Sequence, residues 1–155
     1  MTVECGRAGE GDDHAAAFLD AALHLSALPT HPVAPEDIDL FHTVAVVKVP
    51  AEITVSFDGS PADLAFREDL DRLNFSELEP GTPLASVRPT RRPLLLVPAP
   101  DGTNRWREHF EVHDRVLRLA RARMPAMLTK SVSAVRQDCL CYLMERLPLS
   151  DRPAS

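Results

Sequence analysis

The stretch NRWREHFEVHDRVLRLARARM, residues 104–124, decides the fold that the sequence predicts. Apolar or partly apolar side chains recur along it at intervals of 4, 3, 4, 3 and 4 residues. They are Trp106, Phe110, His113, Leu117, Ala120 and Met124. Such heptad-like spacing places side chains on one face of an α-helix. Pro125 kinks or breaks that helix, because proline lacks the amide hydrogen that the helix needs.

A second apolar series continues the helical pattern after Pro125. Its members are Leu128, Val132, Val135, Cys139, Tyr142 or Leu143, and Leu147, and Pro148 ends it. Together the two series predict one long C-terminal helix with a kink at the proline.

Two further helices are expected earlier in the chain. Residues 12–28 carry apolar side chains at Ala15, Phe18, Leu19, Ala22 and Leu23, after an aspartate that can cap the helix. The run Ser60-Pro61-Ala62-Asp63 places a capping serine before a proline at the first helical position. This signal predicts a middle helix that ends near Asn74, with Leu64, Phe66, Leu70 and Leu73 on its buried side.

Four segments favour β-strands. Thr43–Val49 and residues 53–57 are rich in β-branched residues, and the short link at Pro50 suggests an antiparallel hairpin. Leu84–Val87 and Leu94–Val97 are shorter apolar strands. The expected fold class is therefore α+β. In it, a small antiparallel sheet of about four strands is covered by the N-terminal helix, the middle helix and the long C-terminal helix.

This order of elements resembles the small acidic chaperones of bacterial secretion systems. Those proteins alternate helices with an antiparallel sheet and form dimers. The resemblance covers the order of elements alone.

Length and composition indicate an ordinary globular chain. With 155 residues, we expect one domain over residues 12–149 and disordered tails at 1–11 and 150–155. The acidic N-terminal segment does not have the pattern of a signal peptide, and no apolar run approaches the ~20 residues that cross a bilayer. Three cysteines do not make a disulfide framework. We therefore expect a cytoplasmic protein without membrane association.

Charge is distributed unevenly along the chain. Residues 1–80 carry 4 basic and 16 acidic side chains, whereas residues 81–155 carry 13 basic and 7 acidic ones. The two halves can attract each other within the fold, or one face can attract a partner. Because the whole chain has a net charge of −6, general nucleic-acid binding is not expected.

Arginines are the candidate binding residues, since guanidinium groups suit phosphate and carboxylate partners. Within residues 104–124 we select Arg107, Arg115, Arg118 and Arg121, with Arg88, Arg91 and Arg92 upstream as possible members of the same patch. The plainer alternative is a solvated helix face, because Glu111 and Asp114 each precede an arginine by four residues. A small anionic ligand or an acidic partner is the functional alternative.

Histidines and cysteines supply the other candidates. His109 and His113 share one side of the predicted helix and could bind a metal, with His42, Cys139 or Glu108 as a third ligand. Glu111 lies midway between the histidines and so points away from both. Because buried histidines are common, the interpretation favours no metal site and no cofactor. Cys139 is expected to pack in the core, and Cys141 is a weaker candidate for a reactive thiol.

The sequence favours a small non-catalytic binding or accessory protein that acts through protein–protein contacts, with self-association possible. No nucleophile elbow, phosphate-binding loop or paired-cysteine motif is present. The alternative is a small-molecule enzyme with a pocket between the sheet and the C-terminal helix. In that alternative, His113, His109 and Tyr142 carry the acid–base chemistry. Whether the protein is an enzyme stays open at this point.

Overall fold

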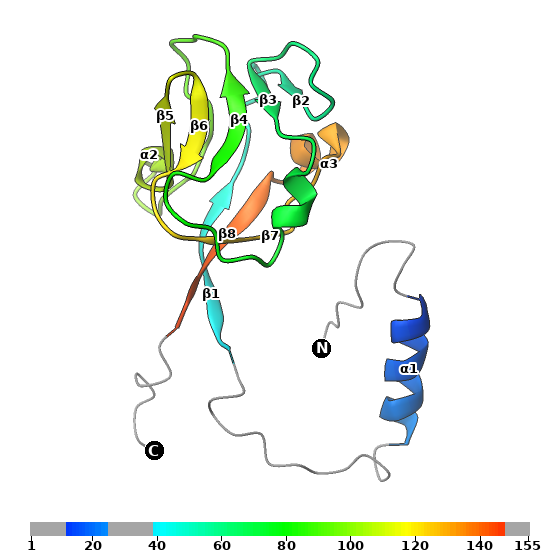
Figure 1. Cartoon of the computed structure of the whole chain (residues 1–155). Helices are drawn as coiled ribbons and strands as arrows, with labels where there is room; N and C mark the ends of the chain where they lie inside the picture. The colour runs from blue at the N-terminus through cyan, green and yellow to red at the C-terminus, as the bar shows by residue number, and fades with distance from the viewer. Residues whose placement is uncertain (1–11, 25–38, 148–155) are drawn as a thin grey trace, which may run out of the picture. The chain divides into compact units, whose positions relative to one another are not determined.

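The structure, a computed structural model, describes residues 12–24 and 39–147 (Figure 1). The chain forms two compact units, residues 1–38 and 39–155. In the first unit a helix, α1, spans Asp12–Leu23, and its Phe18, Leu19 and Leu23 side chains are exposed. The tails predicted at residues 1–11 and 150–155 lie outside the described residues. The single domain expected over residues 12–149 stays a prediction.

The second unit contains an antiparallel sheet of three strands. β1 spans Phe41–Val47, β7 Met124–Ala126 and β8 Cys141–Arg146, and the strand order is β1-β8-β7. The β-branched residues of β1 suit a strand, and this part of the sequence-based prediction is confirmed. β1 pairs with β8 from Phe41 opposite Arg146 to Val47 opposite Cys141. The segment that the second apolar series placed in a helix therefore supplies the central strand.

Five strands form the other sheet. β2 spans Val55–Ser56, β3 Leu64–Phe66, β4 Pro83–Val87, β5 Phe110–His113 and β6 Val116–Leu119. Their order is β2-β3-β4-β6-β5, and all neighbours are antiparallel except β2 and β3. A 3-10 helix, η3, follows β3 at Leu70–Leu73. Two short helices complete the described part of this unit: α2 at Trp106–His109 and α3 at Val132–Gln137.

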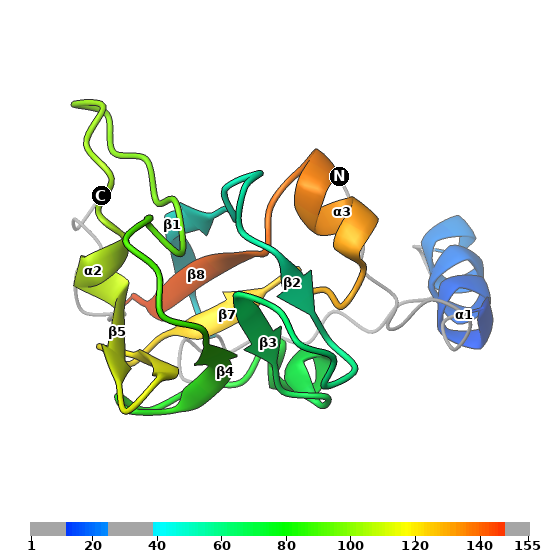
Figure 2. The ribbon, with the colours of Figure 1, turned by 90° about the horizontal axis from the view of Figure 1, so that it is seen from above.

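One hydrophobic core joins the two sheets. Its most deeply buried side chains come from both, among them Val47 and Leu143 from the three-stranded sheet and Leu64, Phe110 and Leu117 from the five-stranded one. Figure 2 shows α2 beside β5 at one end of the unit and α3 beside β2 at the other. The core therefore lies between sheets, and the helices are peripheral.

The predicted long C-terminal helix is wrong. Residues 104–124 contain the single turn α2, and the chain then forms the hairpin β5–β6. Asp114 and Arg115 connect the two strands with positive φ angles of 49° and 60°, which is the backbone of a tight hairpin turn. In β6, Leu117 and Leu119 are buried while Val116 and Arg118 are half-buried, so the side chains alternate with the period of a strand. Strand pairing with β4 and β5 overrides the helical spacing.

The middle helix and the hairpin are wrong too. β3 and η3 occupy the segment in which the middle helix was expected, and Ser60 serves a turn, because the carboxylate of Asp58 accepts a bond from its backbone amide at 3.1 Å. β2 pairs with β3 and not with β1. Leu84–Val87 is confirmed as a strand in β4, but residues 94–97 form only an isolated bridge through Leu96. The fold is mainly β, so the resemblance to secretion chaperones in element order does not hold.

Candidate functional site: an arginine pocket

The best candidate site is a pocket of about 280 Å³ at one end of the five-stranded sheet, here called the arginine pocket. Three segments form it: the end of β4 with the loop after it, the start of α2, and the β5–β6 hairpin. The residues that line it are Val87, Pro89, Thr90, Arg92, Leu94, Trp106, Arg107, Val112 and Arg115. Three of these nine side chains are guanidinium groups.

Backbone and side-chain hydrogen bonds hold the three segments together. The amide of Val87 donates to the carbonyl of Arg115 at 2.8 Å, so the end of β4 is tied to the hairpin turn. The side chain of Asn104 donates to the carbonyl of Leu95 at 2.9 Å and accepts from the amide of Val97 at 2.8 Å. This amide clamp fixes the chain immediately before Trp106 and Arg107. Hydrogen bonds therefore fix the backbone on both sides of the pocket, at Val87 and just before Trp106.

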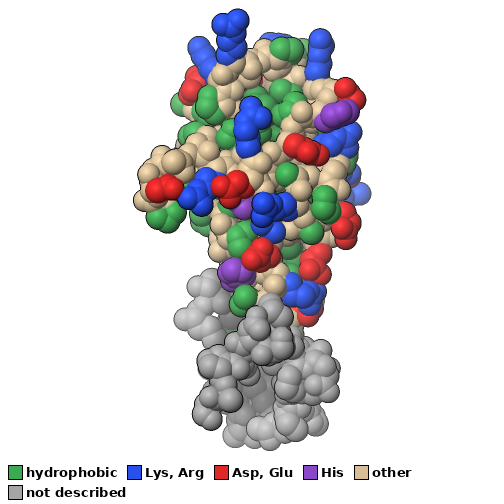
Figure 3. Space-filling view, turned by 90° about the vertical axis from the view of Figure 1, so that its left-hand side faces the viewer, with side chains coloured by type: hydrophobic (Ala, Val, Ile, Leu, Met, Phe, Trp, Pro, Cys, Tyr) green, Lys and Arg blue, Asp and Glu red, His purple; other side chains and the backbone are tan. Residues whose placement is uncertain are grey.

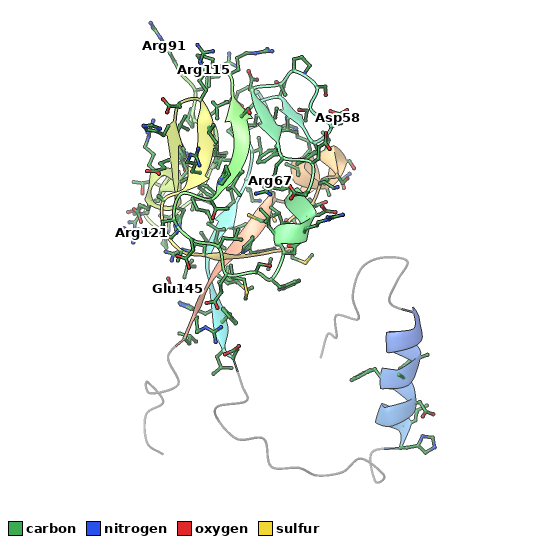
Figure 4. All side chains as sticks on the ribbon, viewed as in Figure 1. Asp58, Arg67, Arg91, Arg115, Arg121 and Glu145 are labelled. Atoms are coloured by element: carbon green, nitrogen blue, oxygen red, sulfur yellow. The ribbon has the colours of Figure 1, made fainter. Side chains whose placement is uncertain are left out.

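No carboxylate of the described residues forms an ion pair with the three arginines of the pocket. Among the residues that the structure describes, Arg92, Arg107 and Arg115 have no carboxylate within ion-pair distance, and all three side chains are exposed. Arg88 and Arg91 lie on the same loop and are exposed as well. Figure 4 shows Arg91 and Arg115 at the same end of the second unit, where lysine and arginine side chains stand out in Figure 3.

Asp63 is an acid whose pKa the arginines of the loop after β4 affect. Two hydrogen bonds from Thr54 are the main cause that lowers the pKa of this carboxyl, and the charges of Arg88 and Arg92 lower it further. Asp63 accepts bonds from the amide and the hydroxyl of Thr54 at 2.9 and 2.8 Å. The carboxylate of Asp63 is thus hydrogen-bonded to Thr54, and Asp63 is not a lining residue of the pocket.

The four arginines selected from the sequence do not all lie in one place in the fold. Arg107 and Arg115 line the pocket together with Arg92, which the sequence suggested only as an upstream neighbour. Arg118 lines a different pocket, of about 730 Å³, beside β3, β4 and β6, and it donates to the carbonyl of Gly81 at 2.9 Å. Arg121 is exposed and lies away from Arg115 (Figure 4). Trp106 was expected to be a core residue, and it both packs in the core and lines the pocket.

His109 and His113 are not paired on one helix. His109 ends α2 and is 8% exposed, whereas His113 ends β5 with its side chain 75% exposed. Over the described ranges 12–24 and 39–147, no group of three histidine, cysteine or acidic side chains is placed to hold a metal ion. The geometric basis for the metal hypothesis, two histidines at helical spacing, is therefore absent from the structure.

Tyr142, Cys139 and Cys141 lie in or beside β8, in the other sheet. Burial raises the pKa of the Cys139 and Cys141 thiols, so neither is an activated nucleophile. Asp138 and Cys139 raise the pKa of the Tyr142 phenol. Because Tyr142 belongs to β8 and His113 to the far hairpin, the fold does not bring the two candidate acid–base residues to one pocket.

Three side chains, Arg123, Glu145 and His42, connect His109 to the three-stranded sheet. The carboxylate of Glu145 lies 3.1 Å from Nε2 of His42 and 3.0 Å from the guanidinium of Arg123. Arg123 in turn donates a long hydrogen bond of 3.5 Å to Nδ1 of His109. Nδ1 therefore acts as an acceptor, which requires a neutral ring with its proton on Nε2. Burial is the main cause that lowers the pKa of His109. Arg123 and Arg121 lower it further, while Glu108 and Glu145 oppose them.

The lowered pKa of His109 gives the fold a pH dependence. The unfolded chain binds a proton near pH 6.5 and the folded chain only at lower pH, so the unfolded state gains protons first. We expect the contribution of His109 to be complete above that pH. It is lost progressively as the pH falls from about 6.5 towards the folded pKa. Urea unfolding across this range measures the effect.

A matched pair of variants isolates that effect. His109→Gln removes the titrating group and should flatten the loss of stability on acidification. His113→Gln removes an exposed histidine and should leave the slope as it is in the natural chain. An equal change of slope in both variants contradicts the assignment to His109.

Comparison with models of protein families, with curated proteins and with solved structures finds no match for this chain. No described helix is both long and apolar enough to cross a membrane.

Proposed function

We propose that the protein is a non-catalytic binding or accessory protein that recognises an anionic group of its partner in the arginine pocket. The observation that carries this proposal is the set of three arginines around one pocket, free of ion pairs with the described residues. Guanidinium groups are fixed forks of donors that match phosphate and carboxylate oxygens. Arginines that no carboxylate of the fold neutralises are available to a charge from outside.

The lining of the pocket supports binding more than catalysis. It contains no histidine, cysteine, carboxylate, lysine or tyrosine, and its one hydroxyl belongs to Thr90. A general acid or base with a pKa near neutrality is therefore missing from the lining. The alternative enzyme needed a pocket under a C-terminal helix, and the described residues contain no such helix. Self-association stays a prediction, to be measured by light scattering of the full chain.

Charge reversal tests the proposal. Trp106 is the only tryptophan of the chain and it lines the pocket, so its fluorescence reports binding there directly. We expect pyrophosphate to change this fluorescence in a saturable way, and to bind more weakly as the salt concentration rises. Arg92→Glu and Arg115→Glu should each weaken binding by about tenfold or more, because each removes a charged donor and adds a repulsive charge.

Arg121→Glu is the matched control, since it makes the same change of charge on an exposed arginine outside the pocket. It should leave pyrophosphate affinity within about twofold of the natural chain, because long-range charge effects are screened. The proposal is wrong if pyrophosphate leaves the fluorescence unchanged. It is equally wrong if the control weakens binding as much as the pocket variants do.

A further inference from the structure

The walls of the arginine pocket are largely apolar. Five of the nine lining residues are Val87, Pro89, Leu94, Trp106 and Val112. Val87, Leu94 and Trp106 are buried in the core, whereas Val112 is 40% exposed. An inorganic anion would satisfy the arginines but leave this apolar wall in contact with water. A wholly apolar ligand would cover the wall but take water away from the guanidinium groups without replacing their hydrogen bonds.

Arg107 lies between the charged part and the apolar part of the lining. Its guanidinium carbon lies 4.6 Å from the centroid of the Trp106 ring, a cation–π contact that holds the side chain over the indole. An arginine held in this way can donate hydrogen bonds from its edge and stack with its face. The site therefore offers charge recognition and a flat stacking surface side by side.

Size and charge narrow the ligand. The volume of about 280 Å³ lies at the lower end of small-molecule sites, which suits one ring and one anionic group. Three guanidinium groups match an anion that carries about two negative charges, as a phosphate monoester does at neutral pH. We infer that the arginine pocket takes a phosphate monoester whose organic part contains a flat ring. This inference rests on the proposed function, because it specifies the anion that the same site recognises.

Two sources present this chemistry: a phosphorylated tyrosine side chain of a protein partner, and a nucleoside monophosphate. Phenyl phosphate carries the shared chemistry alone and is the first probe. Its affinity for the full chain is compared with that of inorganic phosphate, both followed by Trp106 fluorescence. We expect phenyl phosphate to bind about tenfold more tightly, because its ring covers the apolar wall.

A valine pair tests whether the wall provides that preference. Val112→Ser makes the exposed part of the wall polar, and it should weaken the binding of phenyl phosphate more than the binding of inorganic phosphate. Val132→Ser changes a similarly exposed valine, 45% exposed on α3 and outside the pocket, and should leave the preference intact. Far-ultraviolet circular dichroism of both variants shows that the fold is retained.

The outcomes separate the two proposals. Equal affinities for phenyl phosphate and inorganic phosphate overturn the ring inference and leave the anion site standing. No response to phenyl phosphate, inorganic phosphate or pyrophosphate overturns both. Once phenyl phosphate is preferred, O-phosphotyrosine and adenosine monophosphate are compared. Tighter binding of either supports the inference and identifies its source, whereas weaker binding of both than of inorganic phosphate overturns it.

Discussion

Replacement of Leu119 by alanine is expected to lower the free energy of unfolding by about 2–5 kcal/mol, the usual cost of truncating a fully buried leucine. Leu119 is 1% exposed in β6 and faces the core between the two sheets. The helical interpretation of the same stretch placed it outside the apolar series and placed His113 inside. In the structure the positions are reversed, since the side chain of His113 is 75% exposed. His113→Ala should therefore change the free energy of unfolding by less than about 0.5 kcal/mol.

Urea unfolding of the two variants measures this contrast and decides between sheet and helix for residues 104–124. A destabilised His113→Ala together with an unaffected Leu119→Ala would contradict the hairpin. Leu117→Ala is a useful third variant, because both interpretations bury Leu117 and both expect a large loss of stability.

Asn74→Ala is the second change with a large expected effect, about 2–3 kcal/mol in the free energy of unfolding. The side-chain amide of Asn74 donates to the carbonyl of Leu128 at 2.7 Å, and its oxygen accepts from the amide of Leu128 at the same distance. Alanine leaves both backbone groups without these partners. These two hydrogen bonds also join two strained turns, since Phe75 and Met127 each have a φ of 57°, a region that costs side chains other than glycine about 1–3 kcal/mol.

Ser76→Ala is the control for Asn74→Ala, because it truncates an exposed side chain two residues away. Thermal unfolding should separate the two variants clearly, with the control close to the natural chain. Asn74→Asp keeps the acceptor for Leu128 but loses the donor, so it should fall between them. If Asn74→Ala unfolds at the same temperature as the control, the Asn74–Leu128 hydrogen bonds do not hold the turn.

The arginine pocket shows which parts of a binding site can be predicted from the sequence. Arg107 and Arg115 were selected from the residues alone, because the types of side chain that bind anions can be read without a fold. Arg92 was suggested only as a neighbour, and Arg118 and Arg121 were selected but lie elsewhere. No pattern within the chain shows that the loop after β4 meets the β5–β6 hairpin. That proximity depends on which strands pair.

The sequence by itself determined the features that depend on local chemistry: the helix at Asp12–Leu23, the β-branched strand at Phe41–Val47, the strand at Pro83–Val87 and the supply of arginines. Only the tertiary structure decided residues 104–147, where a helical spacing and a strand alternation coexist in the same apolar residues. The Asp114–Arg115 turn and the ladders to β4 and β1 bury Leu117, Leu119 and Leu143 between two sheets. Pairing across the sheets satisfies the backbone and the core at once, and these long-range contacts outweigh a helix preference worth less than about 1 kcal/mol per residue.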